Sequence, residues 1–202
     1  MFVLVENDSI TKTLQSNKGI TLGENQYPRS IYNLWSEEER EAIGIYEVVF
    51  DNTNKKDDEY YANTNQSFTF ADGTVTASYG SSTAKALADV NATDEDGVEL
   101  DPVVVIEGLK TKHKRIIKQQ ASSLLTANDW YVIKATEVGS YSVPGAITTY
   151  RANVRTKSND MEVLIDACST VDELATLYQH VNTGTEEEPV MERPLGEFPE
   201  AV

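Results

Sequence analysis

Short apolar, β-branched runs recur along the first 80 residues, and in two of them, residues 66–70 and 74–79, apolar and polar residues alternate with the period of two that is typical of β-strands. The clearest runs are residues 2–6, 9–14, 45–50, 66–70 and 74–79. The turn-forming pair Asn7-Asp8 separates the first two runs, and Asp72-Gly73, a dipeptide that favours type I′ hairpins, separates the last two. The pattern predicts a small β-rich domain over residues 1–80.

One short helix is expected inside this domain. Ser36 and Glu39 have the spacing of a capping box, in which the serine hydroxyl accepts from the Glu39 amide and the glutamate accepts from the Ser36 amide. Gly44 supplies a C-terminal stop a few residues later.

Apolar positions recur every three or four residues beyond residue 101, which indicates amphipathic helices. The three expected apolar faces are Ile106, Leu109, His113, Ile116, Ile117, Gln120 and Leu124; Ile147, Tyr150, Arg151, Val154, Met161, Leu164, Ile165 and Cys168; and Val171, Leu174, Leu177, Tyr178 and Val181. Pro144 suits the first turn of the second helix, and Thr170 with Glu173 forms a capping box for the third.

These patterns predict an α+β protein in which a small β-rich N-terminal domain precedes a three-helix C-terminal domain over residues 102–182. Small and acidic residues at 81–101 indicate a linker between the two domains. Residues 183–202, which are polar and carry a run of three glutamates, are expected to form an extended tail.

Charge and length exclude several functional classes. The net charge of −16 argues against nucleic acid as a partner, because backbone phosphates would be repelled. No apolar run reaches the roughly 18 residues needed to cross a bilayer, so no membrane partner is expected. The N-terminal residues lack the features of a secretory signal, and a single cysteine, Cys168, fits synthesis in a reducing cytoplasm.

The charge is unevenly distributed along the sequence. Residues 110–157 contain nine basic and two acidic side chains, a local balance of +7, whereas the remainder carries −23. Such a split favours head-to-tail pairing of copies or docking on an acidic partner. The alternative is that a basic helical face and acidic loops keep the protein soluble.

Catalytic and metal-binding patterns are weak. His113 and His180 belong to different predicted helices, and Cys168 ends an apolar face, where a free cysteine behaves as a small hydrophobic residue. The acidic segments 57–59 and 94–97 lack the ligand spacing of a calcium loop, and no Cys/His spacing matches zinc sites. We therefore expect no enzymatic activity and no cofactor.

Aromatic residues of the front domain are candidate partner-binding residues, because Tyr and Trp are enriched in the energetic centres of interfaces. They are Tyr27, Tyr32, Trp35, Tyr60 and Tyr61. The alternative for each is packing over a small β core.

A structural role is expected for Trp130, Tyr150, Arg151 and Arg155. We expect Trp130 to pack against the apolar face of the helix that begins near Pro144. Arg151 and Arg155 lie four residues apart on one helix face, and one of them is expected to pair with Asp129.

A family resemblance rests on the same region. The elements are Asp129-Trp130-Tyr131, Lys134, Glu137, Gly139, Pro144, Ile147, Tyr150-Arg151, Val154 and Arg155. This pattern of a helix, a tryptophan before a loop and a proline-started helix with a Tyr-Arg pair resembles the C-terminal segment of tailed-bacteriophage tail proteins, notably tail-fibre assembly proteins and related tail structural proteins. Residues 27–38 and 189–196 also resemble phage tail sequences, so the resemblance covers roughly half of the chain.

The resemblance implies a non-enzymatic protein, made in the host cytoplasm and present in several copies in the virion tail, that contacts tail or tail-fibre proteins. The longer β-rich front part and the charge split depart from fibre-assembly proteins and favour a structural role. Two alternatives stay open: a tail-fibre assembly chaperone absent from the mature virion, and an acidic DNA mimic that inhibits a host protein.

Overall fold

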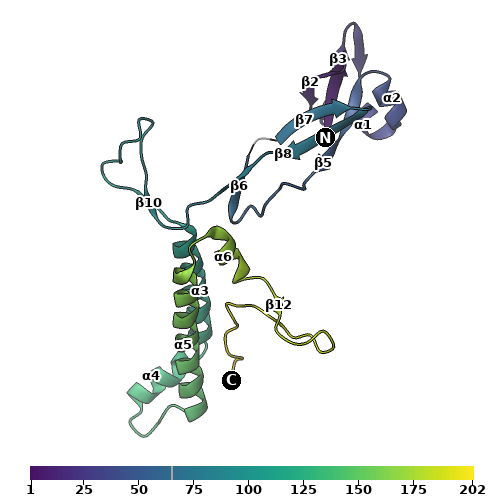
Figure 1. The fold of residues 1–202 in the computed structure, drawn as a ribbon. Helices are drawn as coiled ribbons and strands as arrows, with labels where there is room; N and C mark the ends of the chain where they lie inside the picture. The colour runs from purple at the N-terminus through teal and green to yellow at the C-terminus, as the bar shows by residue number, and fades with distance from the viewer. Residues whose placement is uncertain (65) are drawn as a thin grey trace. The chain divides into compact units, whose positions relative to one another are not determined.

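The chain combines α and β structure in two compact units, Met1–Thr83 and Ala84–Val202 (Figure 1). The computed structural model describes residues 1–64 and 66–202. A curled sheet occupies the first unit, and the helices of the second follow it in sequence. The boundary between the units falls within the expected linker, residues 81–101.

Five strands form the sheet of unit 1, in the order β2-β1-β5-β8-β7. They are β1 (Phe2–Glu6), β2 (Ser9–Leu14), β5 (Ile45–Asp51), β7 (Gln66–Ala71) and β8 (Thr74–Tyr79). Neighbours pair antiparallel except β5 and β8, which are parallel. The two edge strands β2 and β7 approach each other, so the sheet is curled.

Short elements complete unit 1. They are β3 (Ile20–Leu22), β4 (Asn25–Tyr27), α1 (Ile31–Leu34), α2 (Glu37–Glu41), β6 (Tyr61–Asn63) and β9 (Ser82–Ala84). The capping box of Ser36 and Glu39 is present at the start of α2, which confirms the prediction.

Both predicted hairpin turns have the positive φ angles that type I′ geometry requires. The φ angles are 51° at Asn7 and 57° at Asp8 in one turn, and 50° at Asp72 and 76° at Gly73 in the other. At Gly44 a positive φ of 79° coincides with close packing, because a Cβ there would lie 2.7 Å from the Val5 carbonyl oxygen. The positive φ favours glycine at this position, and the close approach of the Val5 carbonyl leaves no room for a Cβ.

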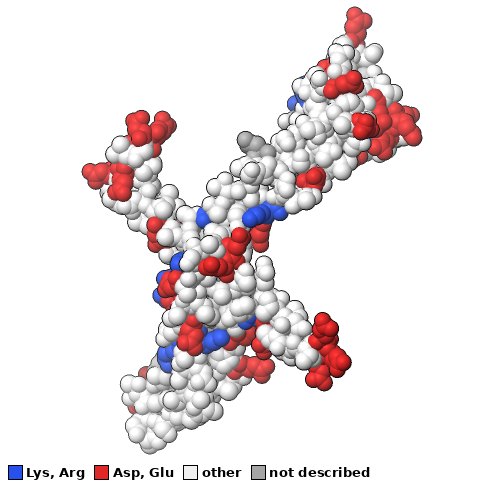
Figure 2. Space-filling model, viewed as in Figure 1, with Lys and Arg blue, Asp and Glu red and all other residues white. Residues whose placement is uncertain are grey.

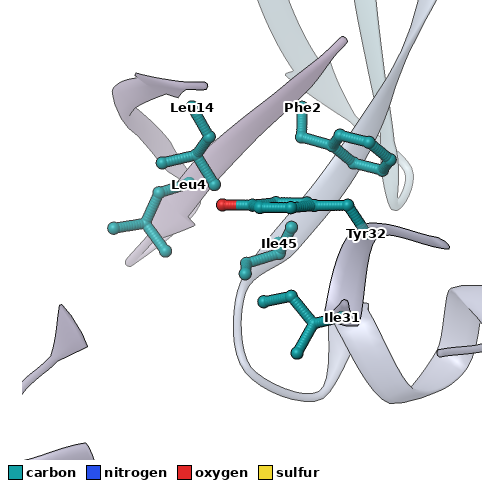
Figure 3. Packing of buried hydrophobic residues seen from close by; sticks show 6 residues of the cluster. All are labelled: Phe2, Leu4, Leu14, Ile31, Tyr32 and Ile45. Atoms are coloured by element: carbon teal, nitrogen blue, oxygen red, sulfur yellow. The ribbon is translucent and has the colours of Figure 1, made fainter. Parts of the chain in front are cut away.

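Each face of the sheet packs its own hydrophobic cluster, because successive residues of β1 point to opposite faces. One cluster is made of Phe2, Leu4, Leu14, Ile31, Tyr32 and Ile45 (Figure 3). The other is made of Val3, Val5, Val48, Val75 and Ala77.

Unit 2 is organised around two long helices. Its helices are α3 (Leu109–Thr126), α4 (Asp129–Glu137), α5 (Gly145–Ala167) and α6 (Val171–Thr176). The sequence predicts three helices; the described residues of this unit contain four, because residues 129–137 form a helix of their own after a turn at Ala127-Asn128. The predicted capping box of Thr170 and Glu173 is present at α6.

The helices α3 and α5 run antiparallel with a fixed register. Ion pairs join Lys114 to Asp166 and Lys118 to Glu162. Residues four positions later on α3 therefore face residues four positions earlier on α5. Between the helices lies a cluster formed by Ala121, Tyr150 and Val154, to which Phe198 of the C-terminal segment adds its ring.

Two hairpins extend from the expected linker and tail into the expected helical domain, residues 102–182. Strands β10 (Val90–Asn91) and β11 (Val105–Ile106) pair antiparallel, and β12 (Val181–Asn182) pairs with β13 (Met191–Glu192). Ile106 and Val181, which the sequence places on helix faces, lie instead in strands β11 and β12, because α3 begins only at Leu109 and α6 ends at Thr176. The expected extended tail is instead folded back, because Leu195 is buried and its amide donates to the Leu177 carbonyl at 3.0 Å. The segment is acidic on average, but Leu195 is buried and Phe198 packs against the cluster between α3 and α5, and these two apolar side chains anchor it.

Candidate interaction surfaces

A hairpin over residues 90–106, here called the arm, projects from the start of α3 (Figure 1). Most of its large apolar side chains are exposed to solvent, including 61% of Val98 and 58% of Val103. The full set is Val90, Val98, Leu100, Val103, Val104, Val105 and Ile106. A lone two-stranded hairpin is marginal in water, and contiguous exposed apolar residues mark contact sites. This surface is not predicted from the sequence, because the acidic residues 94–97 stand out more strongly than the apolar run at 103–106.

The base of the arm is fixed to α3 by backbone hydrogen bonds. The amides of Leu109 and Lys110 donate to the carbonyls of Ala86 and Leu87 at 2.9 and 3.0 Å. The Gly108 amide donates to the Asp89 carboxylate at 2.8 Å, so an aspartate remote in sequence caps the helix. A Cβ at Gly108 would overlap the Ala88 backbone, so only glycine lets the two segments approach this closely.

The electrostatics of this junction follow from the same bond. Donation by the Gly108 amide holds the pKa of the Asp89 carboxyl below its usual value, with a further contribution from the Thr111 side chain. The carboxylate is thus stabilised in its charged form at the positive end of α3.

Helix α4 carries a second exposed apolar surface, and Trp130 lies in it. The indole is 50% exposed and stacks on Tyr131, with ring centroids 3.9 Å apart, while the Lys134 ammonium lies 5.6 Å from its centroid. Val132 and Ile133 of the same helix are also exposed. The predicted burial of Trp130 against α5 is wrong. A turn separates α3 from α4, so Trp130 does not continue the apolar face of α3, and its indole is left half exposed.

Arg151 has the structural role that the sequence predicts. Its guanidinium is buried and donates to the Asp129 carboxylate at 2.8 Å and to the Leu125 carbonyl at 2.7 Å. The predicted pairing of one of the two arginines with Asp129 is therefore confirmed for Arg151. Arg155 is exposed and donates to the Arg151 carbonyl at 3.4 Å, while Tyr150 is buried in the interhelical cluster as expected.

In unit 1, the first group of aromatic residues packs into the core. Tyr32 is only 5% exposed, and its ring centroid lies 5.1 Å from that of Phe2 (Figure 3). Tyr27 and Trp35 are half-buried against the same cluster, edge to face at 5.7 Å. The packing alternative therefore describes Tyr32 best, whereas Tyr27 and Trp35 keep some surface for a partner.

Tyr60 and Tyr61 are likewise buried, although the sequence places them beside a polar loop. The Lys56 ammonium lies 4.2 Å from the ring centroid of Tyr61. Because both side chains are buried, a partner could not contact them, and we do not propose Tyr60 or Tyr61 as partner-binding residues.

The charge split along the sequence does not divide the two units. Unit 1 has 13 acidic and 6 basic residues, and unit 2 has 20 and 11, so both are acidic. Three of the five cations of α3 form ion pairs within unit 2: Lys114 with Asp166, Lys118 with Glu162 and Arg115 with Glu107. Part of the basic stretch is therefore neutralised by acids that lie outside it in sequence.

Some acidic side chains lie at the ends of loops, and another group, Glu37, Glu38, Glu39 and Glu41, lies on α2. Figure 2 shows red clusters at the tip of the arm, where Asp94, Glu95 and Asp96 lie, and at the tip of the β12–β13 hairpin, which carries Glu186, Glu187 and Glu188. Such isolated tips differ from a regular row of negative charge.

Groups with catalytic potential are placed in structural roles. His113 is buried, with Nδ1 2.9 Å from the Tyr178 hydroxyl, and its ring packs against that of Tyr178. Cys168 is buried, its thiol donates to the Leu164 carbonyl at 3.4 Å, and burial raises the pKa of the thiol. A buried, neutral thiol is a poor nucleophile.

Within residues 1–64 and 66–202, no group of three or more His, Cys, Asp or Glu side chains is placed to hold a metal ion. Nor does any helix in this part of the chain combine the length and apolar character needed to cross a bilayer.

Comparison with known proteins gives no match: no family model, no curated protein and no solved structure is similar to the chain.

Proposed function

We propose that the protein is a non-enzymatic structural component of a bacteriophage tail, where several copies contact tail or tail-fibre proteins. The observation that carries the proposal is the arm, whose apolar side chains are exposed while its base is tightly bonded to α3. Apolar surface of this kind gains free energy when a partner covers it, at roughly 25 cal/mol per Å².

The exposed apolar face of α4 supports the same function. It contains Trp130, Val132 and Ile133, and large aromatic side chains commonly anchor protein interfaces. The sequence resemblance to tail proteins centres on this helix and on α5, so the resemblance and the exposed surface coincide at Trp130.

The two alternatives differ in where the protein is found. A tail-fibre assembly chaperone contacts fibres during assembly and is absent from finished particles. A DNA mimic contacts a host DNA-binding protein and needs a regular array of acidic groups, whereas groups of acids lie at loop tips and on the short helix α2 (Figure 2). The structural role therefore fits the distribution of charge and of apolar surface best.

Quantitative mass spectrometry of gradient-purified virions tests the proposal. We expect the protein at a fixed ratio to the tail subunits. Its absence from virions, together with co-purification with free fibres, overturns the structural role in favour of a chaperone. Recovery of a host DNA-binding protein and no tail protein from infected cells overturns it in favour of a DNA mimic.

A variant pair tests the surface itself. The double substitution Val103→Asn and Val105→Asn changes exposed residues of the arm, and Val163→Asn changes an equally exposed valine on α5. We expect the arm variant to fold normally and to be incorporated less into virions, with Val163→Asn incorporated like wild type. Equal incorporation of both variants contradicts a role for the arm.

A further inference from the structure

Unit 1 contains a small cavity of about 180 Å³ between β2, the turn that follows it and α1. Its walls include Lys12, Leu14, Lys18, Gly19, Ile20 and Tyr32. At about 30 Å³ per water molecule, the volume suits about six waters, or an acid group with a few attached atoms.

The Tyr32 hydroxyl is a hydrogen-bond donor at the wall of the cavity. Tyr32 is 5% exposed, and its hydroxyl points toward Leu14 and Leu4 (Figure 3). No described residue forms a hydrogen bond with this hydroxyl, which borders the cavity and is open to a ligand or to water there. Burial raises the pKa of the phenol, so at neutral pH the group retains its proton and can donate it in a hydrogen bond.

Two cations line the same cavity. Neither Lys12 nor Lys18 forms an ion pair with any described residue, although acidic side chains outnumber basic ones 13 to 6 in this unit. By contrast, Arg40 lies 3.5 Å from Glu47 and Lys55 lies 3.0 Å from Asp58. No acidic residue is among those that line the cavity, so its donors face no internal competitor.

The wall that carries Lys18 is held in place by backbone packing. A Cβ at Gly19 would lie 2.5 Å from the Tyr27 carbonyl oxygen, so only glycine lets the turn approach β4 this closely. The turn is closed by a bond from the Lys18 amide to the Gln15 carbonyl at 3.4 Å.

We propose that this cavity binds a small oxyanion, a carboxylate or phosphate group, through the Tyr32 hydroxyl and the ammonium groups of Lys12 and Lys18. Hydrogen bonds to an ionised acceptor are about twice as strong as neutral ones, and two lysines supply the opposite charge. The acidic surroundings weaken this attraction only over distances shorter than the screening length, about 8 Å at physiological salt. The site is independent of the tail assignment.

A titration of the full chain followed by ¹H–¹⁵N NMR tests the site, with sodium phosphate and sodium acetate as probes and sodium chloride at matched ionic strength as the reference. We expect saturable shifts of the amides of residues 12–20 at probe concentrations on the order of 10 mM, which corresponds to a dissociation constant in the millimolar range. Saturation by phosphate alone identifies a phosphoryl ligand, and saturation by both probes identifies acid groups in general; either result supports the site.

Three variants separate the site from general attraction of anions. We expect Lys12→Gln with Lys18→Gln to weaken binding about tenfold or more, and Tyr32→Phe, which keeps the core ring, to weaken it several-fold. Lys112→Gln removes one exposed lysine of α3, half the charge that the double lysine variant removes, and should leave affinity unchanged.

Three results overturn the proposal. The first is a set of shifts that do not saturate or that chloride reproduces. The second is an equal loss of affinity in Lys112→Gln. The third is a loss in the lysine variant with none in Tyr32→Phe, since this pattern describes surface attraction and not a cavity site.

Discussion

Arg151 and Asp129 form an ion pair that joins two helices at the end of the helical hairpin. The guanidinium of Arg151 in α5 donates to the Asp129 carboxylate of α4 at 2.8 Å and to the Leu125 carbonyl of α3 at 2.7 Å. A single side chain thus holds the turn between α3 and α4 against α5, which explains why a charged residue is buried at this point.

Removal of this guanidinium should destabilise unit 2. Arg151→Ala leaves the Leu125 carbonyl and Asp129 without their donor, and we expect the free energy of unfolding to fall by about 1–3 kcal/mol. Asp129→Ala should cost less, because the carboxylate is half exposed and water replaces its partner. Chemical denaturation monitored by circular dichroism measures both. A larger loss for Asp129→Ala than for Arg151→Ala contradicts this account.

Two positions on α5 should respond very differently to the same kind of truncation. Met161 is 2% exposed and Val163 is 66% exposed. Met161→Ala opens a cavity and should cost about 2–5 kcal/mol. Val163→Ala should stay within about 0.5 kcal/mol of wild type. Similar denaturation midpoints for the two variants would show that the assigned faces of α5 are wrong.

Two glycines of unit 1 separate backbone strain from steric exclusion. Both Gly23 and Gly44 have positive φ, but a Cβ at Gly23 meets no atom within 4 Å. Gly23→Ala should therefore cost only the strain of the left-handed conformation, about 1–2 kcal/mol. Gly44→Ala must also displace the Val5 carbonyl and should cost at least about 1 kcal/mol more. Thermal unfolding of both variants provides the comparison. Equal losses of stability would mean that strand β1 moves away from the new Cβ at little cost in free energy.

The Asp89 cap gives a pH dependence of definite sign. Its pKa is lowered in the folded state, so the bond to Gly108 stabilises the protein above the ordinary aspartate value of 3.8 and the contribution is lost as pH falls through the folded pKa. A carboxyl ¹³C titration should give Asp89 a midpoint below 3.8. The Gly108 amide shift should follow the same curve, and in Asp89→Asn that transition should disappear. A midpoint at or above the ordinary value would contradict the cap.

Local rules account for the parts of the fold that the sequence predicts. The hairpins around Asn7-Asp8 and Asp72-Gly73 and the capping boxes at Ser36 and Thr170 depend on residues a few positions apart, so their geometry follows from the sequence directly. The pairing of Arg151 with Asp129 also follows, because a loop of known length brings the two helices together.

The features that the sequence does not predict depend on contacts between residues far apart in the chain. Trp130 lies on a separate helix because of a turn at Ala127-Asn128, which no strong breaker marks in the sequence. The cap of α3 comes from Asp89, 19 residues away, and the ion pairs of α3 come from acids of α5. Such partners become visible only when the chain has folded. The parallel pairing of β5 with β8 is of the same kind.

The length of α3 has a consequence for how the protein attaches to others. Eighteen residues at 1.5 Å each give a rod of about 27 Å, and its register against α5 is fixed by ion pairs along the rod. The arm is bonded to one end of this rod and α4 follows the other, so the two exposed apolar surfaces that we propose as contact sites are held at a set spacing. A partner with two matching sites gains from bivalent attachment, in which weak contacts reinforce each other through a high effective concentration. For such a partner, the length of α3 determines the distance between the two sites that can be bound at the same time.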